Sequence, residues 1–307
     1  MIVLFFVIIA AMRVMQKVCT KKVSNAVTGK TYFHYGGYYQ LLSALFSLIT
    51  LAIVGFYGFN WKTVACAFGT AVFMAIELFA SIEALKGCTL IVSQMFSVGA
   101  LFIPCLFGIF FFDEPMSIWQ WIGLSLFIFA MYFMVSPTKE KKSQEKRKTS
   151  GKTIVMLLLT MFAGGGPMVM QKVFGRLVPG GNTAAYSFLM FAINALLLYS
   201  CYVIQSLLKE RTSITVDNEE KEPRFEILPK MLLICGACLA FAIFMINMLV
   251  TELGKTVPSV ILFSVSYAIS IGITLIVGRF YYNEKITRKN IVGIVLCVGA
   301  LAIISFL

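Results

Sequence analysis

Two stretches of this chain share one pattern: residues 110–123 read FFFDEPMSIWQWIG, and residues 280–293 read FYYNEKITRKNIVG. Three positions are identical in the two copies, namely Phe110 and Phe280, Glu114 and Glu284, and Gly123 and Gly293. Each copy lies between two long apolar runs, so each predicts a tight hairpin between apolar helices. A hairpin of this kind that occurs twice is typical of a duplicated membrane domain.

The composition excludes an ordinary soluble protein. Hydrophobic residues make up 59% of the 307 residues and charged residues 13%, against about 45–50% and about 25% in soluble domains. The net charge of +12 is concentrated in short segments, such as the seven cations between Lys139 and Lys152. Basic segments between apolar runs suit anionic lipid headgroups. We therefore expect membrane lipids as partners and no nucleic acid.

The apolar runs predict an all-α integral membrane protein with ten transmembrane helices. Most runs are close to the roughly 20 residues that cross a bilayer. They cover residues 1–16, 36–57, 62–84, 88–111, 118–136, 153–174, 184–208, 229–250, 255–280 and 289–307. Two long polar connections, 137–152 and 209–230, separate groups of these spans.

The repeat divides the ten spans into two halves. An offset of 170 residues relates the two hairpins, and an offset of 155 relates MQKV at 15–18 to MQKV at 170–173. We therefore expect a first five-helix repeat (1–136), a basic linker (137–152) and a second five-helix repeat (153–307). Because five is an odd number, the second copy crosses the membrane in the opposite direction, which makes the two halves an inverted repeat.

The cations predict the orientation. Connections after spans 1, 3, 5, 7 and 9 hold 21 of the 26 Lys and Arg, whereas the remaining connections hold four. The positive-inside rule then places connections 137–152 and 209–230 in the cytoplasm and both termini outside, in a plasma-membrane protein.

The architecture and the hairpin resemble the drug/metabolite transporter superfamily, in its ten-helix EamA-domain branch. That family has a Glu in the hairpin and a Gly nine residues later, as here in Glu114 with Gly123 and Glu284 with Gly293. The resemblance covers essentially the whole chain. It implies secondary transport of a small organic solute, such as a metabolite, an amino acid or an amphipathic cation, without a cofactor. The sequence has no GxxxxGK[ST] nucleotide-binding motif, which agrees with transport that does not use ATP. The family generally keeps both termini in the cytoplasm, so the cation count departs from it, and we expect the inverted orientation.

Glu77 is the leading candidate for a substrate or proton site. It lies deep in the apolar run 62–84, where an acid costs roughly 2.5–3.5 kcal/mol to insert, so we expect it to face a wet cavity or a partner charge. The offset of 170 relates Glu77 to Asn247, which predicts a cavity on the twofold axis of the repeat. A carboxyl in apolar surroundings resists ionisation, which suits proton exchange. A structural tie to a neighbouring helix is the alternative.

Further polar candidates lie in other spans. Arg13 is the natural partner of Glu77, but it can equally snorkel to an interface, because Lys17 follows one turn later. Spans four and nine supply the remaining candidates, which are Gln94, Ser97, Ser266, Tyr267 and Ser270. Hydroxyls in membrane helices also bond their own backbone or a neighbouring helix, so packing is the alternative for them.

Three other features have structural interpretations. The run Gly164, Gly165, Gly166 and Pro167 in span six permits either a hinge for alternating access or a close helix contact. Glu114 and Glu284, with Gly123 and Gly293, are expected to hold the hairpins together at opposite membrane surfaces. An aromatic cluster at the start of span two is interpreted as an aromatic belt at a membrane interface, with a binding lip as the alternative; it consists of Tyr32, Phe33, His34, Tyr35, Tyr38 and Tyr39.

Together these features predict a secondary active transporter, an exporter or exchanger that acts by alternating access as a monomer or homodimer, and not an enzyme. No metal is expected: Cys235 and Cys238 have a CxxC spacing, but they lie in an apolar run far from His34, the only histidine. The alternatives are a non-transporting sensor or assembly module and a membrane-embedded transferase. The sequence lacks the DDxxD and HExxH motifs that would favour the transferase.

Overall fold

A computed structural model of the chain describes residues 2–27, 31–112, 117–135, 151–213, 228–253, 259–283 and 288–306. Within these segments the chain forms helices and connections, with no β-strand. The helices are α1 (Ile2–Val23), α2 (Thr31–Val54), α3 (Trp61–Gly87), α4 (Leu90–Gly99), α5 (Phe102–Phe112), α6 (Ile118–Val135), α7 (Gly151–Leu177), α8 (Thr183–Ser213), α9 (Lys230–Leu253), α10 (Ser259–Phe280) and α11 (Arg288–Phe306).

The helices are those of a multi-pass membrane protein. Among the described residues, six helical segments are long and apolar enough to cross a bilayer: Thr31–Val54, Trp61–Gly87, Leu90–Phe111, Gly151–Leu177, Thr183–Leu207 and Lys230–Leu253. Three shorter apolar segments are Ile118–Ala130, Ser264–Phe280 and Ile291–Ile303. Large apolar side chains such as Ile53, Ile118 and Phe280 are more than three-quarters exposed. Polar side chains such as Ser43, Asn194 and Ser270 are fully buried. This arrangement of polar residues inside and apolar residues outside suits a hydrocarbon solvent.

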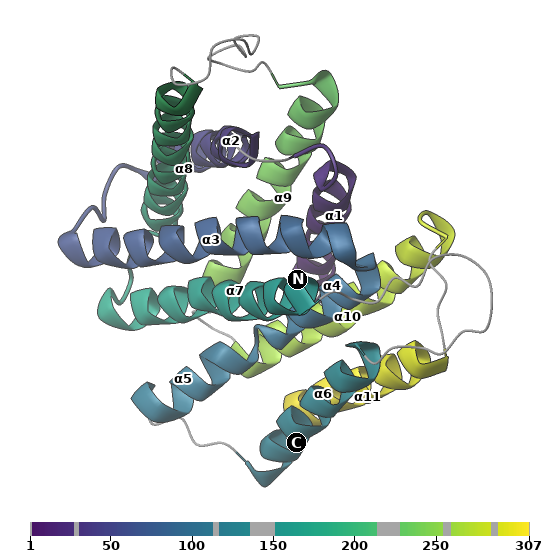
Figure 1. The fold of residues 1–307 in the computed structure, drawn as a ribbon. Coiled ribbons are helices and arrows are strands. Elements are labelled where there is room, and N and C mark those ends of the chain that lie inside the picture. The colour runs from purple at the N-terminus through teal and green to yellow at the C-terminus, as the bar shows by residue number, and fades with distance from the viewer. Residues whose placement is uncertain are drawn as a thin grey trace.

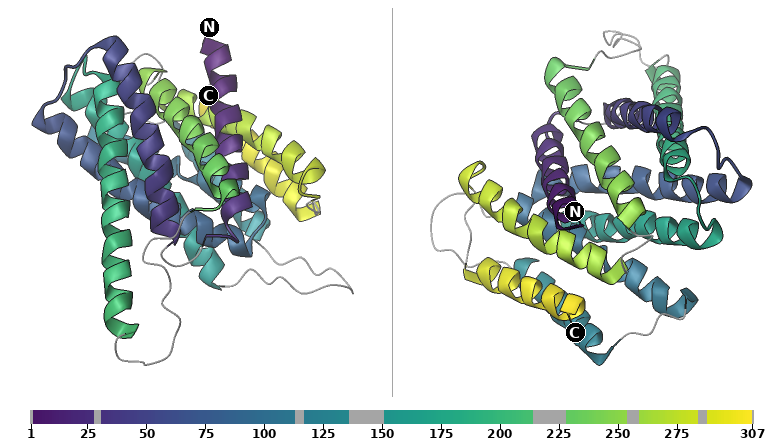
Figure 2. Two further views of the ribbon diagram at one scale, coloured as in Figure 1. Left: turned by 90° about the horizontal axis from the view of Figure 1, so that it is seen from above. Right: turned by 180° about the vertical axis from the view of Figure 1, so that it is seen from behind.

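The helices are arranged in three groups (Figure 1). Helices α2 and α8 pack together at one edge, and α6 and α11 pack together at the opposite edge. Between them, α3 packs along α7 and α1 packs along α9, so the most extensive contacts join the first half of the chain to the second. From other directions the same grouping is visible, with the start of α1 and the end of α11 toward one end of the bundle (Figure 2).

Two separate apolar cores hold these groups together. One core is centred on α4, α6, α10 and α11 and includes Met95, Phe127 and Ile271. The other is centred on α2 and α8 and includes Tyr35, Phe191 and Leu198. Helices α1, α3, α7 and α9 contribute to both cores, because each passes from one to the other. The interior midway along these four helices therefore lies where the two cores meet.

The fourth predicted span is not one continuous helix. It breaks after α4, where the Ala100 and Leu101 amides donate to the carbonyls of Ser97 and Val98 at 3.2 and 3.0 Å. The physical reason is Pro104, which has no N–H for the Ala100 carbonyl four residues earlier and whose ring would collide with that carbonyl in a continuous helix. The prediction of a single helix over 88–111 overlooked this proline.

Two further expectations need correction. Tyr32, Tyr35 and Tyr39 are 5%, 0% and 3% exposed and pack in the α2/α8 core, so they do not form an aromatic belt. Helix α7 begins at Gly151 and α8 continues to Ser213, so both helices extend into the connections predicted at 137–152 and 209–230.

The repeated hairpin is described only in part. Glu114 and Glu284 lie outside the described residues. Gly123 on α6 and Gly293 on α11 are both buried. Because α6 packs along α11, the helices that follow the two hairpins contact each other directly.

Candidate functional site

A cavity of about 100 Å³ lies midway along α1, α3, α7 and α9, where the two apolar cores meet. Apolar residues of both cores form part of its wall, including Met74 and Leu78 of one and Met168 and Val250 of the other. The remaining wall is unusually polar for the interior of a membrane protein. Its charged and polar residues are Arg13, Gln16, Lys17, Thr20, Tyr39, Gln40, Glu77, Ser81, Gln94, Ser97, Gln171, Asn247 and Tyr267.

Glu77 lies on the cavity wall near the middle of α3. Its carboxyl group faces Gly164 of α7 so closely that a β-carbon added there would lie 3.4 Å from Cδ and from Oε1 of Glu77. The charges that act on it most are those of Lys17 and Arg13 on α1. Within the described part of the chain Glu77 has no ion pair within 4.0 Å, so it meets these cations across the cavity and not by direct contact.

Arg13 joins α1 to α10. Its Nη1 donates a hydrogen bond of 2.8 Å to the hydroxyl of Tyr267, and its Cζ lies 4.0 Å from the centroid of the same ring. Its Nε is buried and has no hydrogen-bond partner among the described residues. The guanidinium is therefore anchored at one end and retains an unused donor.

Lys17 was not predicted as a site residue. The sequence interpretation placed it at the membrane interface, but its side chain is only 5% exposed and lines the cavity one helical turn from Arg13. It forms no ion pair within 4.0 Å among the described residues. The signal that could have found it is the spacing of four residues from Arg13, which puts both cations on one face of α1.

Amide side chains complete the cavity wall. Gln171 Nε2 donates to Asn247 Oδ1 at 2.7 Å, which joins α7 to α9, and Gln94 Nε2 donates to Ser270 Oγ at 2.9 Å, which joins α4 to α10. Gln40 and Gln94 are 1% and 2% exposed, and the Oε1 atom of each has no partner among the described residues. Buried amide oxygens without a donor are costly, so these two are poised to accept one.

The predicted residues therefore gather in one place, with two exceptions. Six of them line the cavity: Arg13, Glu77, Gln94, Ser97, Asn247 and Tyr267. Ser270 is buried behind Gln94, its hydrogen-bond donor, and Ser266 is buried away from the cavity wall. Gln16, Gln40 and Gln171 also line the cavity, although they were not among the predicted site residues.

The glycine run of α7 makes close contacts with α3 and the α4–α5 break. A β-carbon on Gly165 would lie 2.9 Å from the Ala100 carbonyl oxygen, and one on Gly166 would lie 2.2 Å from the ring of Phe73. Helix α7 continues through Gly164, Gly165, Gly166 and Pro167 without interruption. The close helix contact is thus observed, and a hinge at the same residues stays a prediction.

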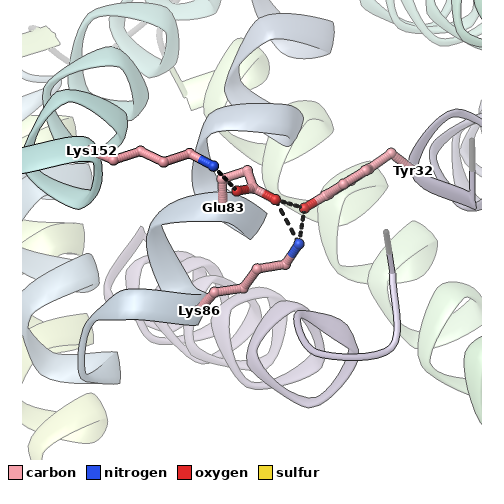
Figure 3. Close-up of polar contacts among 4 residues, drawn as sticks. All are labelled: Tyr32, Glu83, Lys86 and Lys152. Carbon is pink, nitrogen blue, oxygen red and sulfur yellow. Dashed lines mark hydrogen bonds and ion pairs between the residues drawn. The ribbon is translucent and has the colours of Figure 1, made fainter. Parts of the chain in front are cut away.

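A charged cluster lies beyond the cavity, at the carboxyl end of α3 (Figure 3). Glu83 pairs with Lys86 of the same helix at 2.6 Å and with Lys152 of α7 at 3.2 Å, and it accepts a short hydrogen bond from the Tyr32 hydroxyl of α2. Lys86 also donates to Tyr32. The cluster therefore ties α2, α3 and α7 together six residues along α3 from Glu77, about 9 Å at the rise of a helix.

The opposite end of the bundle is joined differently. There Thr183 at the start of α8 donates to Glu252 of α9 at 3.3 Å, and Asn182 donates to the Gly55 and Tyr57 carbonyls. Glu252 is exposed, whereas the Glu83 side chain is only 13% exposed. The two ends of the bundle are thus joined by contacts of different kinds, a charged cluster at one end and hydrogen bonds at the other.

No group of three or more His, Cys, Asp or Glu in the described segments could hold a metal ion. Cys235 of the CxxC spacing is buried and Cys238 is exposed, and both are free thiols.

Comparisons with known proteins bear on the fold alone. No protein-family model matches the sequence, and no curated protein matches it. One solved crystal structure, described only as that of a protein, is 14% identical to this chain with a TM-score of 0.59. The match covers 97% of this chain and 94% of the other. This helical arrangement is therefore one that a solved protein shares over nearly its whole length.

Proposed function

We propose that this protein is a secondary transporter of a small organic solute, with the charged cavity as its binding site. The observation that supports this most is the cavity itself: a polar, charged space midway along the helices of an apolar bundle. Ionisable groups at such depth are costly and mark a solute or ion pathway by default. Structural packing alone would favour neutral residues there.

The inverted repeat belongs to this proposal, and the helix contacts support it. If α1, α2, α3, α4 with α5, and α6 correspond to α7, α8, α9, α10 and α11, each major contact has an equivalent. The α3–α7 contact corresponds to α9–α1, α3–α8 to α9–α2, and α5–α7 to α10–α1. The α2–α8 and α6–α11 contacts correspond to themselves. A pseudo-twofold arrangement of two five-helix units, and hence ten spans, would produce this pattern.

The cavity wall fits the same correspondence. The sequence offsets relate Gln16 to Gln171, Arg13 to Met168, Glu77 to Asn247 and Ser97 to Tyr267. All eight residues line the cavity. A binding site on the axis between two repeats is the usual place in secondary transporters. Membership of the drug/metabolite transporter superfamily, proposed from the hairpin motif, is in line with this arrangement.

The mechanism we propose is alternating access. The two apolar cores move relative to each other about the four helices that they share, so that the cavity opens to one membrane face at a time. Glu77 binds a proton or a group of the solute while the cavity is open, and the Tyr32–Glu83–Lys86–Lys152 cluster closes one face. The glycine run of α7, which lies against Glu77 and the α4–α5 break, is the proposed hinge.

The proposed orientation follows the cation count. Lys17 lies inside the bundle and drops out of that count, but the connections after predicted spans 1, 3, 5, 7 and 9 still hold 20 cations against four in the other connections. We therefore propose that residues 137–152 and 209–230 face the cytoplasm of a plasma-membrane protein. A reporter fused after Leu307 tests this, because a cytoplasmic carboxyl terminus would contradict it.

Cysteine accessibility tests the transport proposal. The eight native cysteines are replaced by alanine, and Ser81→Cys on the cavity wall is exposed to a small membrane-impermeant thiosulfonate from either side of oriented vesicles. Alternating access predicts reaction from both sides. Ser43→Cys, on a buried residue that does not line the cavity, is the matched control and should not react. A sensor or assembly module predicts that Ser81→Cys reacts from one side only or from neither side.

Flux completes the test. Proteoliposomes loaded with a mixture of amino acids, organic acids and amines should release a subset of them in counterflow. Release of none, in vesicles whose cavity cysteine reacts from both sides, would leave a pathway without a solute and would count against a transporter.

A further inference from the structure

The charges of the cavity do not balance. Its lining contains three charged residues: Arg13 and Lys17 from α1, and Glu77 from α3. The other lining residues with a titratable group are Tyr39 and Tyr267, phenols that are neutral near pH 7. With all three charged residues ionised, the cavity holds one excess positive charge. An unpaired charge buried in an apolar interior is costly, so the cavity is complementary to one negative charge.

The two cations are placed to share one anionic group. They lie four residues apart on α1, about 6 Å along the helix axis, and both reach the cavity. Arg13 uses Nη1 for Tyr267 and keeps Nε without a partner among the described residues, and Lys17 has no ion pair within 4.0 Å there. A carboxylate has two oxygens, so it can accept from both cations at once.

Another part of the wall needs hydrogen-bond donors. The buried Oε1 atoms of Gln40 and Gln94 have no partner among the described residues, and both residues line the cavity. A chloride ion would balance the charge but offers no donor. An organic acid that also carries a hydroxyl or amide group could place its carboxylate at the two cations and donate hydrogen bonds to Gln40 and Gln94.

The cavity limits the size of the solute. Its volume of about 100 Å³ is well below the roughly 300–1,000 Å³ of sites for drug-sized ligands. One water needs roughly 10–15 Å³ of such space, so the cavity has room for a solute of fewer than about ten non-hydrogen atoms. Large amphipathic cations fit neither its volume nor its charge in this conformation.

We propose that the solute is a small organic monocarboxylate with a hydroxyl or amide donor, bound by Arg13 and Lys17 at its carboxylate and by Gln40 and Gln94 at its donors. This inference rests on the proposed function, since it names the solute of the same cavity. A zwitterion would place its ammonium group at Glu77 but would leave the excess positive charge in place, so the monoanion is the better match.

A set of small probes of similar size and different charge tests the proposal. Purified protein in nanodiscs is titrated calorimetrically with lactate and glycolate as monoanions, lactamide as the neutral analogue, alanine as the zwitterion and 1-amino-2-propanol as the cation. Chloride and inorganic phosphate are the inorganic anions. We expect saturable binding of lactate or glycolate in preference to all the others. Preference for the amide, the zwitterion, the cation or an inorganic anion, or no binding of either monocarboxylate, would overturn it.

Substitution of the cations locates the site. Lys17→Gln and Arg13→Gln should each weaken monocarboxylate binding about tenfold or more, as expected for the loss of a hydrogen bond to a charged group. Lys172→Gln is the matched control, because Lys172 is the repeat equivalent of Lys17 but does not line the cavity, and it should bind as wild type. If Lys17→Gln does not fold, Lys17→Arg keeps the charge and should retain binding. Unchanged affinity in both glutamine variants would overturn the assignment.

Failure here differs from failure of the transport proposal. If the cavity cysteine reacts from both sides and some solute moves in counterflow, but monocarboxylates neither bind nor move, the solute class is wrong and transport stands. If the cysteine reacts from only one side or from neither, the transport proposal fails whatever binds.

Discussion

The most informative single change is Glu83→Gln, because it removes the charge at the centre of the cluster while keeping the size and one acceptor oxygen. Glu83 contacts two lysines and a tyrosine and joins α3 to both α2 and α7 (Figure 3). If this cluster closes one end of the cavity, the substitution should favour the state that is open at that end. If it only supports the fold, the substitution should lower stability without a preference for either end.

The free energy that the cluster loses in Glu83→Gln follows from the exposure of each partner of Glu83. The Lys152 side chain is 72% exposed, so its pair with Glu83 contributes little. The Lys86 pair is 2.6 Å long with side chains 27% and 13% exposed, and the Tyr32 hydrogen bond is to a charged acceptor. Because glutamine can still accept from Tyr32 and Lys86, we expect a loss of about 1–2 kcal/mol, which corresponds to a factor of about 5–30 in the closed-to-open ratio.

The assay is the rate at which Ser81→Cys reacts with a membrane-impermeant thiol reagent in the cysteine-free background. In the Glu83→Gln variant the rate should rise about 5–30-fold from the side of the α3 carboxyl end and stay unchanged or fall from the other side. Glu252→Gln is the control, because Glu252 lies at the other end of the bundle, on α9, and should not raise the rate from the Glu83 side. An equal rise from both sides would mean general loosening of the bundle and would refute the assignment of the cluster as a closure.

Three further predictions follow from named contacts. Gly166→Ala should lower the free energy of unfolding by about 1–3 kcal/mol, because the new methyl group would lie 2.2 Å from the Phe73 ring; Gly175→Ala on the same helix has no heavy atom within 4 Å of the added carbon and should be neutral or stabilising. Thermal unfolding in detergent compares the two. Glu77→Gln should abolish solute flux or its pH dependence in proteoliposomes, and unchanged flux with an unchanged pH profile would contradict the role of Glu77. Tyr267→Phe should weaken solute binding several-fold without unfolding the protein, because it removes the hydroxyl that anchors Arg13; titration against the wild type measures this, and an unaltered affinity would show that the anchor is dispensable.

The apolar runs and the polar residues within them could be predicted, because burial of polar groups in a bilayer is so costly that position alone carries information. Glu77 was chosen on this ground, Arg13 as its partner and Asn247 from the repeat offset, and the structure places all three on one cavity. The same reasoning failed for Lys17. A lysine near the end of an apolar run has a long side chain that can reach either the interface or the interior, and only the packing of α1 against its neighbours decides between them.

Other misses also have local causes. The aromatic belt was predicted from residue type, but tyrosines suit a buried helix contact as well as an interface, and the interior position of Tyr35 depends on how α2 packs. The unpartnered oxygens of Gln40 and Gln94 have no sequence signal, because they depend on which neighbours happen to donate. In contrast, the break at Ala100 was predictable from Pro104, since the proline acts on a carbonyl at a fixed distance along the chain.

The charges of the cavity are distributed unequally between the two halves of the chain, and this bears on how a site between the two proposed repeats becomes selective. Arg13, Lys17 and Glu77 all belong to the first half, while their equivalents are Met168, Lys172 outside the cavity wall, and Asn247. The second half contributes neutral groups to the wall, such as Gln171 and Tyr267. A symmetric polar cavity would present the same groups to a solute in either orientation. Because both cations lie on α1, the cavity has a positive side, at which the proposed anion would bind. Substitution of the charged residues of α1 should therefore change which solutes bind as well as how tightly, whereas substitution of the neutral wall residues Gln171 and Asn247 should change only how tightly they bind.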